Sequence, residues 1–167
     1  MYLESIDAIK YVFDSSDIAE FCAFTKGFRT DEKCLQDYAL RLVGIIKADK
    51  DFLKNIDFFT YVGNYQNAKT NYSLKLAESI SSATNIPLKN IIEKTSPSKE
   101  VKFLPPQTRK QEIENTFNIT QNIKGAKICI IDDVLATGAT ISTVAGLLKN
   151  VGAQKVYAGI VCLNNAF

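Results

Sequence analysis

The chain has 167 residues, of which 46% are hydrophobic, and a formal net charge of +2, so we expect one domain with a core that needs neither disulfides nor a structural metal. A charge this close to zero does not favour nucleic acid as a partner through bulk electrostatics. No apolar stretch approaches the length of a membrane span, and the start Met-Tyr-Leu-Glu-Ser-Ile-Asp is not signal-like, so we expect a cytoplasmic protein without membrane contact.

The cysteines and the lack of histidine exclude several kinds of chemistry. The chain has no histidine, and its four cysteines include no C-x-x-C pair. A structural zinc site is therefore not expected, and Ser-His-Asp and Cys-His catalysis are excluded. Cys129 and Cys162 lie inside apolar, strand-like runs, so we interpret them as small core residues.

The first half of the chain alternates between strand-like and helix-like patterns. A short strand is predicted at 9–13, and Asp17-x-x-Glu20 is typical of a helix start. Apolar residues at helical spacing predict an amphipathic helix over about 32–47. The elements predicted next are a strand at 56–62 that Gly63-Asn64 ends, a helix at 71–82 and a short strand at 88–93.

Residues 95–110 differ in character from the rest of the chain. They contain three prolines, several hydroxyls and four basic residues, which predicts a mobile, basic surface loop. A short strand at 117–120 and a closing strand at 155–163 follow in the sequence. Strands that alternate with helices predict an α/β fold, with a mostly parallel central sheet flanked by helices.

Residues 128–140 combine an apolar run, two acids and a loop of small residues. The run is apolar on both faces, as in the central strand of a buried parallel sheet. Asp132 and Asp133 follow at the carboxyl end of this predicted strand, where open α/β sheets bind ligands. The loop at 136–140 precedes a helical pattern that Gly152 ends. A phosphate on this loop would lie on the N–H groups and positive dipole end of the helix.

This segment resembles the phosphoribosyl-pyrophosphate (PRPP) signature of the type I phosphoribosyltransferases, which is four apolar residues, two acids, two apolar residues and a Thr-Gly-x-Thr-like loop. The resemblance implies that Asp132 and Asp133 bind the two ribose hydroxyls. The residues that it assigns to the ribose phosphate are Ala136, Thr137, Gly138, Ala139 and Thr140. The position of Ala136 is often Thr in the family. The alternative interpretation is an ordinary strand, turn and helix, but no G-x-G-x-x-G or Gly-Lys-Ser/Thr motif offers another phosphate site.

The resemblance also implies a lid over the departing pyrophosphate. Loss of pyrophosphate through an oxocarbenium-like transition state needs Mg²⁺, here carried by PRPP without a direct protein ligand, and cationic side chains. A basic lid that excludes water meets both needs. The lysines and arginine available in the 95–110 loop are Lys99, Lys102, Arg109 and Lys110. Arg109 is the first candidate to contact pyrophosphate, because its planar guanidinium suits phosphate oxygens, and Lys102 is the second. The alternative interpretation is that these basic residues are ordinary solvated surface side chains. Asp133, Arg109 and Lys102 are thus the predicted catalytic residues.

A second phosphate site is expected where the 56–62 strand ends. In the family a short loop there contacts pyrophosphate through backbone groups, and Tyr61, Val62, Gly63 and Asn64 would supply it. A glycine after a strand is also commonly a turn residue, which is the alternative interpretation.

More of the chain is similar to the ComF group of competence-associated phosphoribosyltransferase-like proteins. Lys26-Gly27-Phe28 and the helices around it resemble the segment that precedes the first core strand of that group. Of its Arg-Gly-aromatic-Asn stretch only Asn71 is present, and its zinc ribbon is absent. We expect one domain over 1–167, with a small N-terminal hood and leading helices over about 1–50 and the core over about 51–167.

Three functions remain open from the sequence. The first is Mg²⁺-dependent transfer of the phosphoribosyl group to a small nitrogenous acceptor, with release of pyrophosphate. The second is a non-catalytic PRPP-binding regulatory or competence (DNA-uptake) accessory protein, and the third is an α/β phosphate-binding protein unrelated to PRPP. Ala136 stands where hypoxanthine-type enzymes usually carry another Asp, which counts against a hypoxanthine or guanine acceptor. A homodimer is the default expectation from the family.

Overall fold

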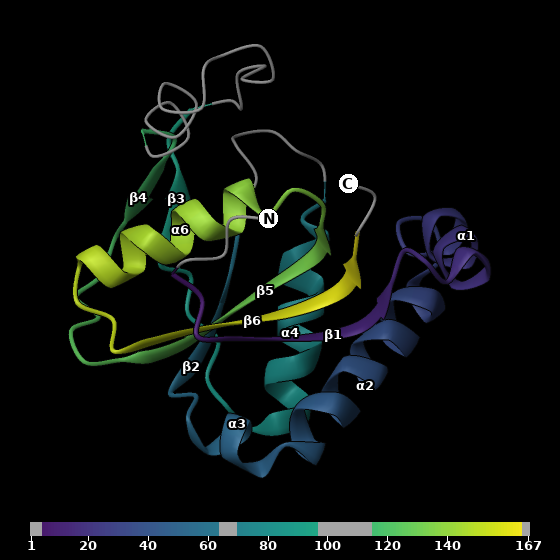
Figure 1. The fold of residues 1–167 in the computed structure, drawn as a ribbon, viewed down its shortest axis with the longest axis horizontal. Helices are drawn as coiled ribbons and strands as arrows, with labels where there is room; N and C mark the ends of the chain where they lie inside the picture. The colour runs from purple at the N-terminus through teal and green to yellow at the C-terminus, as the bar shows by residue number, and fades with distance from the viewer. Residues whose placement is uncertain (1–4, 64–69, 97–114, 165–167) are drawn as a thin grey trace.

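The computed structural model describes residues 5–63, 70–96 and 115–164. Four parallel strands form its central sheet in the order β1-β6-β5-β2 (Figure 1). Their bounds are β1 Ala8–Asp14, β2 Phe58–Tyr61, β5 Lys127–Leu135 and β6 Lys155–Leu163. The expected α/β fold with a mostly parallel sheet is confirmed, and the closing strand has the predicted bounds.

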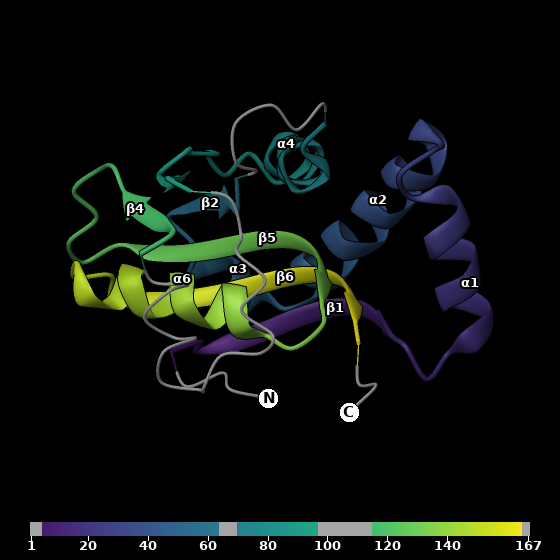
Figure 2. The ribbon, with the colours of Figure 1, turned by 90° about the horizontal axis from the view of Figure 1, so that it is seen from above.

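Helices cover both faces of this sheet (Figure 2). The helices are α1 Ile18–Gly27, α2 Glu32–Ala48, α3 Lys50–Lys54, α4 Tyr72–Thr84 and α6 Ala139–Asn150. Alternate residues of β5 divide between two core clusters. Cys129 and Ile131 pack with α2 and α4, whereas Ile128 and Ile130 pack with α6. Both faces of β5 are therefore buried, as its continuous apolar run predicted.

Side-chain caps define where most of the helices begin. Asp17, Asp31, Asp49 and Asn71 each accept a hydrogen bond from a backbone N–H of the first turn, at the starts of α1, α2, α3 and α4. Such caps satisfy donors that the helix itself cannot. At α6 the N-cap position is Gly138, which offers no side chain.

The strand predicted at 88–93 is placed differently by the structure. Leu88 makes only an isolated parallel bridge to Phe59. The strand itself, β3 (Ile92–Lys94), pairs antiparallel with β4 (Phe117–Ile119) in a separate two-stranded sheet. Backbone bonds from Phe59 N to Pro87 O and from Lys89 N to Phe59 O, of 2.8 and 2.9 Å, hold the chain beside β2 only briefly before it leaves the central sheet.

The division into a hood over 1–50 and a core needs correction. β1 is an edge strand of the central sheet, where Ala8 pairs with Tyr157 and Phe13 with Cys162. Apolar residues of α2 pack on the same sheet. α1 lies beyond the end of the sheet, next to the first part of α2 (Figures 1 and 2). The N-terminal segment therefore builds part of the core, because its strand has apolar positions to bury.

α2 approaches the sheet closely at Gly159 of β6. A Cβ built on Gly159 would lie 2.8 Å from Ile131 Cδ1, 3.7 Å from Leu42 and 3.8 Å from Cys129 Sγ. The absence of a side chain there leaves room for Leu42 of α2 and for Ile131 of β5. Within residues 5–63, 70–96 and 115–164, no helix is both long and apolar enough to cross a bilayer.

Candidate functional site

The two adjacent acids lie within β5, not after it. β5 continues to Leu135 because β6 pairs with it as far as Leu163. On its other side, β2 ends at Tyr61, opposite Ile131. Among the described residues, β5 is therefore paired with β6 alone from Asp132 onward, and the acids lie at the carboxyl end of β2. Side chains from other segments reach the acids at this edge of the sheet.

Each acid receives a hydrogen bond from a different segment of the chain. Ser73 Oγ, in the first turn of α4, donates to Asp132 Oδ1 over 2.8 Å. Arg29 Nη2, in the turn between α1 and α2, donates to Asp133 Oδ2 over 2.7 Å in an ion pair. Backbone amides add two bonds, from Asp133 N to Asp132 Oδ1 (3.0 Å) and from Val134 N to Asp133 Oδ1 (2.9 Å).

Burial perturbs the first of the two acids. Loss of hydration raises the pKa of Asp132, and the negative charge of Asp133 raises it further. The Ser73 hydroxyl, the Asp133 amide and the Arg29 guanidinium lower the pKa of Asp132 but do not cancel the rise. In the ligand-free protein Asp132 therefore has a higher pKa than an ordinary aspartate and keeps its proton to a higher pH.

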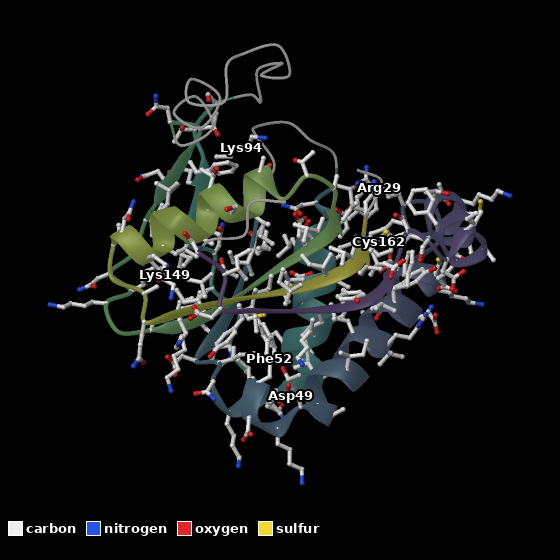
Figure 3. All side chains as sticks on the ribbon, in the orientation of Figure 1. Arg29, Asp49, Phe52, Lys94, Lys149 and Cys162 are labelled. Atoms are coloured by element: carbon white, nitrogen blue, oxygen red, sulfur yellow. The ribbon has the colours of Figure 1, made fainter. Side chains whose placement is uncertain are left out.

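A carboxylate at the opposite end of the sheet shows the contrast. Asp7 accepts bonds of 2.7, 2.9 and 2.8 Å from Lys149 Nζ, Lys155 Nζ and Val156 N. These donors outweigh its loss of hydration and lower the pKa of Asp7 to about 2. Lys149 and Arg29 lie at opposite ends of the sheet (Figure 3). Asp7 is thus a structural anion with its charge balanced, whereas the charge of the Asp132–Asp133 pair is balanced only in part.

We expect Asp132→Asn to raise the free energy of unfolding of the ligand-free protein at pH 8, by on the order of 1 kcal/mol. Above the raised pKa, Asp132 is charged in both states, and its charge costs more in the folded state. Below the ordinary carboxyl pKa of about 3.9, Asp132 is neutral in both states, so the gain disappears. Asn keeps an Oδ1 that can accept from Ser73 and from the Asp133 amide.

Thermal unfolding of wild type and Asp132→Asn at pH 8 and at about pH 3, below the ordinary carboxyl pKa, measures this difference. Asp37→Asn is the control, because the Asp37 side chain is 69% exposed. If Asp132→Asn has a lower free energy of unfolding than wild type at pH 8, the prediction that the charge of Asp132 destabilises the folded protein is wrong.

The loop after β5 leads directly into α6. Gly138 has a φ of 76°, in the left-handed region that favours glycine. Ala139 N donates to Thr137 Oγ1 over 3.3 Å, whereas Ala136, Thr137 and Thr140 are exposed. Because Gly138 supplies no cap, amides of the first turn of α6 can point at an anion, which the helix dipole also favours.

The loop after β2 lies beside the acids, but only part of it is described. Tyr61 pairs with Ile131, the residue before Asp132, and Val62 and Gly63 follow. A Cβ on Gly63 would make an ordinary contact of 3.5 Å with Ile92 O. Asn64 lies outside the described residues, as do the lid candidates Lys99, Lys102, Arg109 and Lys110.

Sequence reasoning missed three residues of this site, Arg29, Tyr72 and Ser73. Tyr72 Oη donates to the Arg29 carbonyl over 2.7 Å, and Arg29 Cζ lies 5.6 Å from the Tyr72 ring centroid. Arg29 directly follows the Lys26-Gly27-Phe28 stretch, and Ser73 lies two residues after Asn71. Proximity to those two motifs was the only signal in the sequence for these residues.

The described residues offer few ligands for a metal ion. Within 5–63, 70–96 and 115–164, no three His, Cys, Asp or Glu side chains come together in a way that could hold one. A Mg²⁺ ion that arrives already bound to phosphate oxygens would need no such cluster of protein ligands.

Comparisons with known proteins identify relatives of the segment that carries the acids. A family model described as phosphoribosyl transferase domain matches residues 71–166, from the start of α4 through β6. The chain is 35% identical to the DNA utilization protein YhgH of Escherichia coli (strain K12) over 60 residues, which are 36% of this chain and 26% of that protein. It is 25% identical to competence protein F of Haemophilus influenzae over 85 residues, 48% of this chain and 37% of that protein. The matches therefore span well under half of these relatives.

A solved structure shows the same fold. The crystal structure of purine phosphoribosyltransferase from Pyrococcus horikoshii Ot3 superposes with a TM-score of 0.51 and 20% identity, over 77% of this chain and 73% of that one. The family resemblance predicted from residues 128–140 is confirmed, and the two named relatives confirm the similarity to the ComF group. Arg29 lies outside the matched region, whereas Ser73, Asp132 and Asp133 lie inside it.

Proposed function

Because the chain belongs to the phosphoribosyltransferase family, we propose that it binds PRPP and transfers the phosphoribosyl group to a small nitrogenous acceptor. In this reaction the bond from the anomeric carbon to pyrophosphate breaks, and the acceptor nitrogen supplies the electron pair of the new bond. The observation that carries the proposal is the acid pair, held at the open edge of β5 directly before an uncapped helix.

The acids have capacity for the ribose hydroxyls. Asp132 accepts its two hydrogen bonds on Oδ1, so its Oδ2 has no partner within the described part of the chain. Asp133 accepts one bond on each oxygen, and each carboxylate oxygen has two lone pairs. Both carboxylates can therefore accept a hydrogen bond from a ribose hydroxyl without losing a hydrogen bond that they already have.

The phosphate groups would lie on either side of the ribose. The 5′-phosphate fits the amides of residues 137–140 at the start of α6. Pyrophosphate fits the backbone after β2, at Val62 and Gly63, beside the acids. Mg²⁺ carried by PRPP would stabilise the negative charge that develops on pyrophosphate, and Arg109 and Lys102 remain the candidates to assist it.

A pyrophosphate-release assay tests the enzyme directly. Wild type with PRPP and Mg²⁺ is offered a panel of purines, pyrimidines and amines, and the double Asp132→Asn, Asp133→Asn variant is the blank. Acceptor-dependent pyrophosphate that the variant does not produce supports transfer. If no acceptor gives pyrophosphate, the transferase proposal loses its support.

A second function is a PRPP-binding accessory protein without turnover. Two observations favour it: only Asn71 remains of the Arg-Gly-aromatic-Asn stretch, and two relatives are named for DNA utilization and competence. PRPP would then raise the unfolding temperature by mass action and be recovered intact. Rapid consumption of PRPP would exclude this function.

A further inference from the structure

The first turn of α4 reaches both acids, one directly and one through Arg29. Asn71 caps this turn by accepting the Leu74 amide over 2.9 Å. Ser73 donates to Asp132 over 2.8 Å. Tyr72 donates to the backbone carbonyl of Arg29, and Arg29 pairs with Asp133. Two consecutive residues of one helix thus fix the surroundings of both carboxylates.

Arg29 is held more firmly than its exposure suggests. Its side chain is 62% exposed, and exposed ion pairs of long side chains contribute little. Here, however, the partner Asp133 side chain is only 13% exposed. The guanidinium lies over the Tyr72 ring, and the Tyr72 hydroxyl fixes the backbone of the same arginine. Phe28, the preceding residue, is buried with its ring 6.1 Å from that of Tyr72.

We propose that Arg29, supported by Tyr72, is a positioning residue for the ribose-binding acids and stays on Asp133 when the ribose hydroxyls bind; this inference rests on the proposed function. The hydrogen bond from Arg29 uses one lone pair of Asp133 Oδ2, so the carboxylate can still accept a hydrogen bond from a ribose hydroxyl. The positive charge of Arg29 offsets the repulsion between the two adjacent carboxylates. The bond from Arg29 to Oδ2 and the bond from Val134 N to Oδ1 together fix the orientation of the Asp133 carboxylate beside Asp132.

Two other roles for Arg29 predict different results. If Arg29 blocks the acids in the ligand-free protein, its removal should tighten ribose binding. If Arg29 binds phosphate itself, its removal should weaken binding of pyrophosphate alone. A positioning role predicts weaker binding of ligands that carry the ribose hydroxyls and unchanged binding of pyrophosphate.

Calorimetric titration with ribose 5-phosphate, PRPP·Mg²⁺ and inorganic pyrophosphate separates these roles. We expect Arg29→Gln to weaken binding of the two ribose ligands about tenfold or more, as expected for loss of a charged hydrogen bond. Binding of pyrophosphate should change less than about twofold. Arg29→Lys keeps the charge and should recover most of the affinity, which a merely structural role would not predict. Tyr72→Leu should show a weaker version of the Arg29→Gln effect.

Arg41→Gln is the matched control. Arg41 also pairs with a carboxylate, Glu20, and its Cζ lies 5.1 Å from the ring of Tyr38, but on α1 and α2 away from the acids. Unchanged or tighter ribose binding in Arg29→Gln, or loss equal to that in Arg41→Gln, would overturn the inference. If the wild type binds neither ribose ligand, or if the Asp132→Asn, Asp133→Asn variant binds both as tightly as wild type does, the proposed function fails and the inference fails with it.

Discussion

The double variant Asp132→Asn, Asp133→Asn is expected to lose at least about 100-fold in PRPP affinity while it remains folded. Each acid would accept a hydrogen bond from a ribose hydroxyl, and a hydrogen bond to a charged group contributes about 1.5–3 kcal/mol. The loss of two such bonds corresponds to a decrease of roughly 10²–10⁴ in affinity. The fold should persist, because Asn keeps an oxygen acceptor for Ser73 and for the backbone amides. Calorimetry gives the affinity, and circular dichroism with thermal unfolding gives the fold.

A charge-matched control separates the site from the net charge. Asp17→Asn with Asp49→Asn also removes two negative charges, at the N-caps of α1 and α3, where Asn caps as well as Asp does. This control should bind PRPP as wild type does. PRPP affinity retained in the Asp132→Asn, Asp133→Asn variant would refute the assignment of these acids to ribose.

Gly159→Val is expected to lower the free energy of unfolding by about 3 kcal/mol, at the upper end of the usual cost of overpacking a core. A Cβ at residue 159 would already lie 2.8 Å from Ile131 Cδ1. The two γ carbons of valine would also meet Leu42, on the face that α2 covers. Chemical denaturation measures the change, and binding of PRPP by the remaining folded protein is not expected to change.

A second-site substitution tests whether Ile131 is the cause. Gly159→Ala should be milder than Gly159→Val, and Ile131→Val removes the Cδ1 atom that the new Cβ approaches. The cost of the double variant should then be less than the sum of its single costs. Gly44→Ala is the control, because nothing lies within 4 Å of its Cβ in α2, and it should stabilise by about 0.5–1 kcal/mol. If the losses of unfolding free energy from the substitutions at 131 and 159 add up in the double variant, Ile131 Cδ1 is not the atom that a Cβ at residue 159 meets.

Elements whose local sequence decides their structure were predicted well. The apolar run of β5, the closing strand β6 and the helix start at Asp17 depend on residues near in sequence. The extension of β5 to Leu135 was missed because it depends on pairing with β6, which overrides the low strand propensity of two acids. The antiparallel pairing of β3 with β4 also joins segments far apart in sequence.

The sequence offers site candidates where one segment carries them, and it gave no indication of the contacts that the fold assembles from distant segments. Asp132 and the phosphate loop share a single stretch of sequence. Arg29 is 104 residues away from Asp133 along the chain, and Ser73 is 59 away from Asp132. No local pattern marks an arginine in a helix–helix turn as the partner of a distant acid. Such a contact becomes visible only when the packing of α1, α2 and α4 on the sheet is known.

The shortness of β2 has a consequence for how this site could be changed. β2 has four residues and ends opposite Ile131, one residue before the acids. Each added strand residue would advance the chain by about 3.3 Å, so an insertion of two would extend the pairing of β2 past Asp132. The length of β2 therefore decides whether the acids lie beside a paired strand or beside side chains such as that of Ser73.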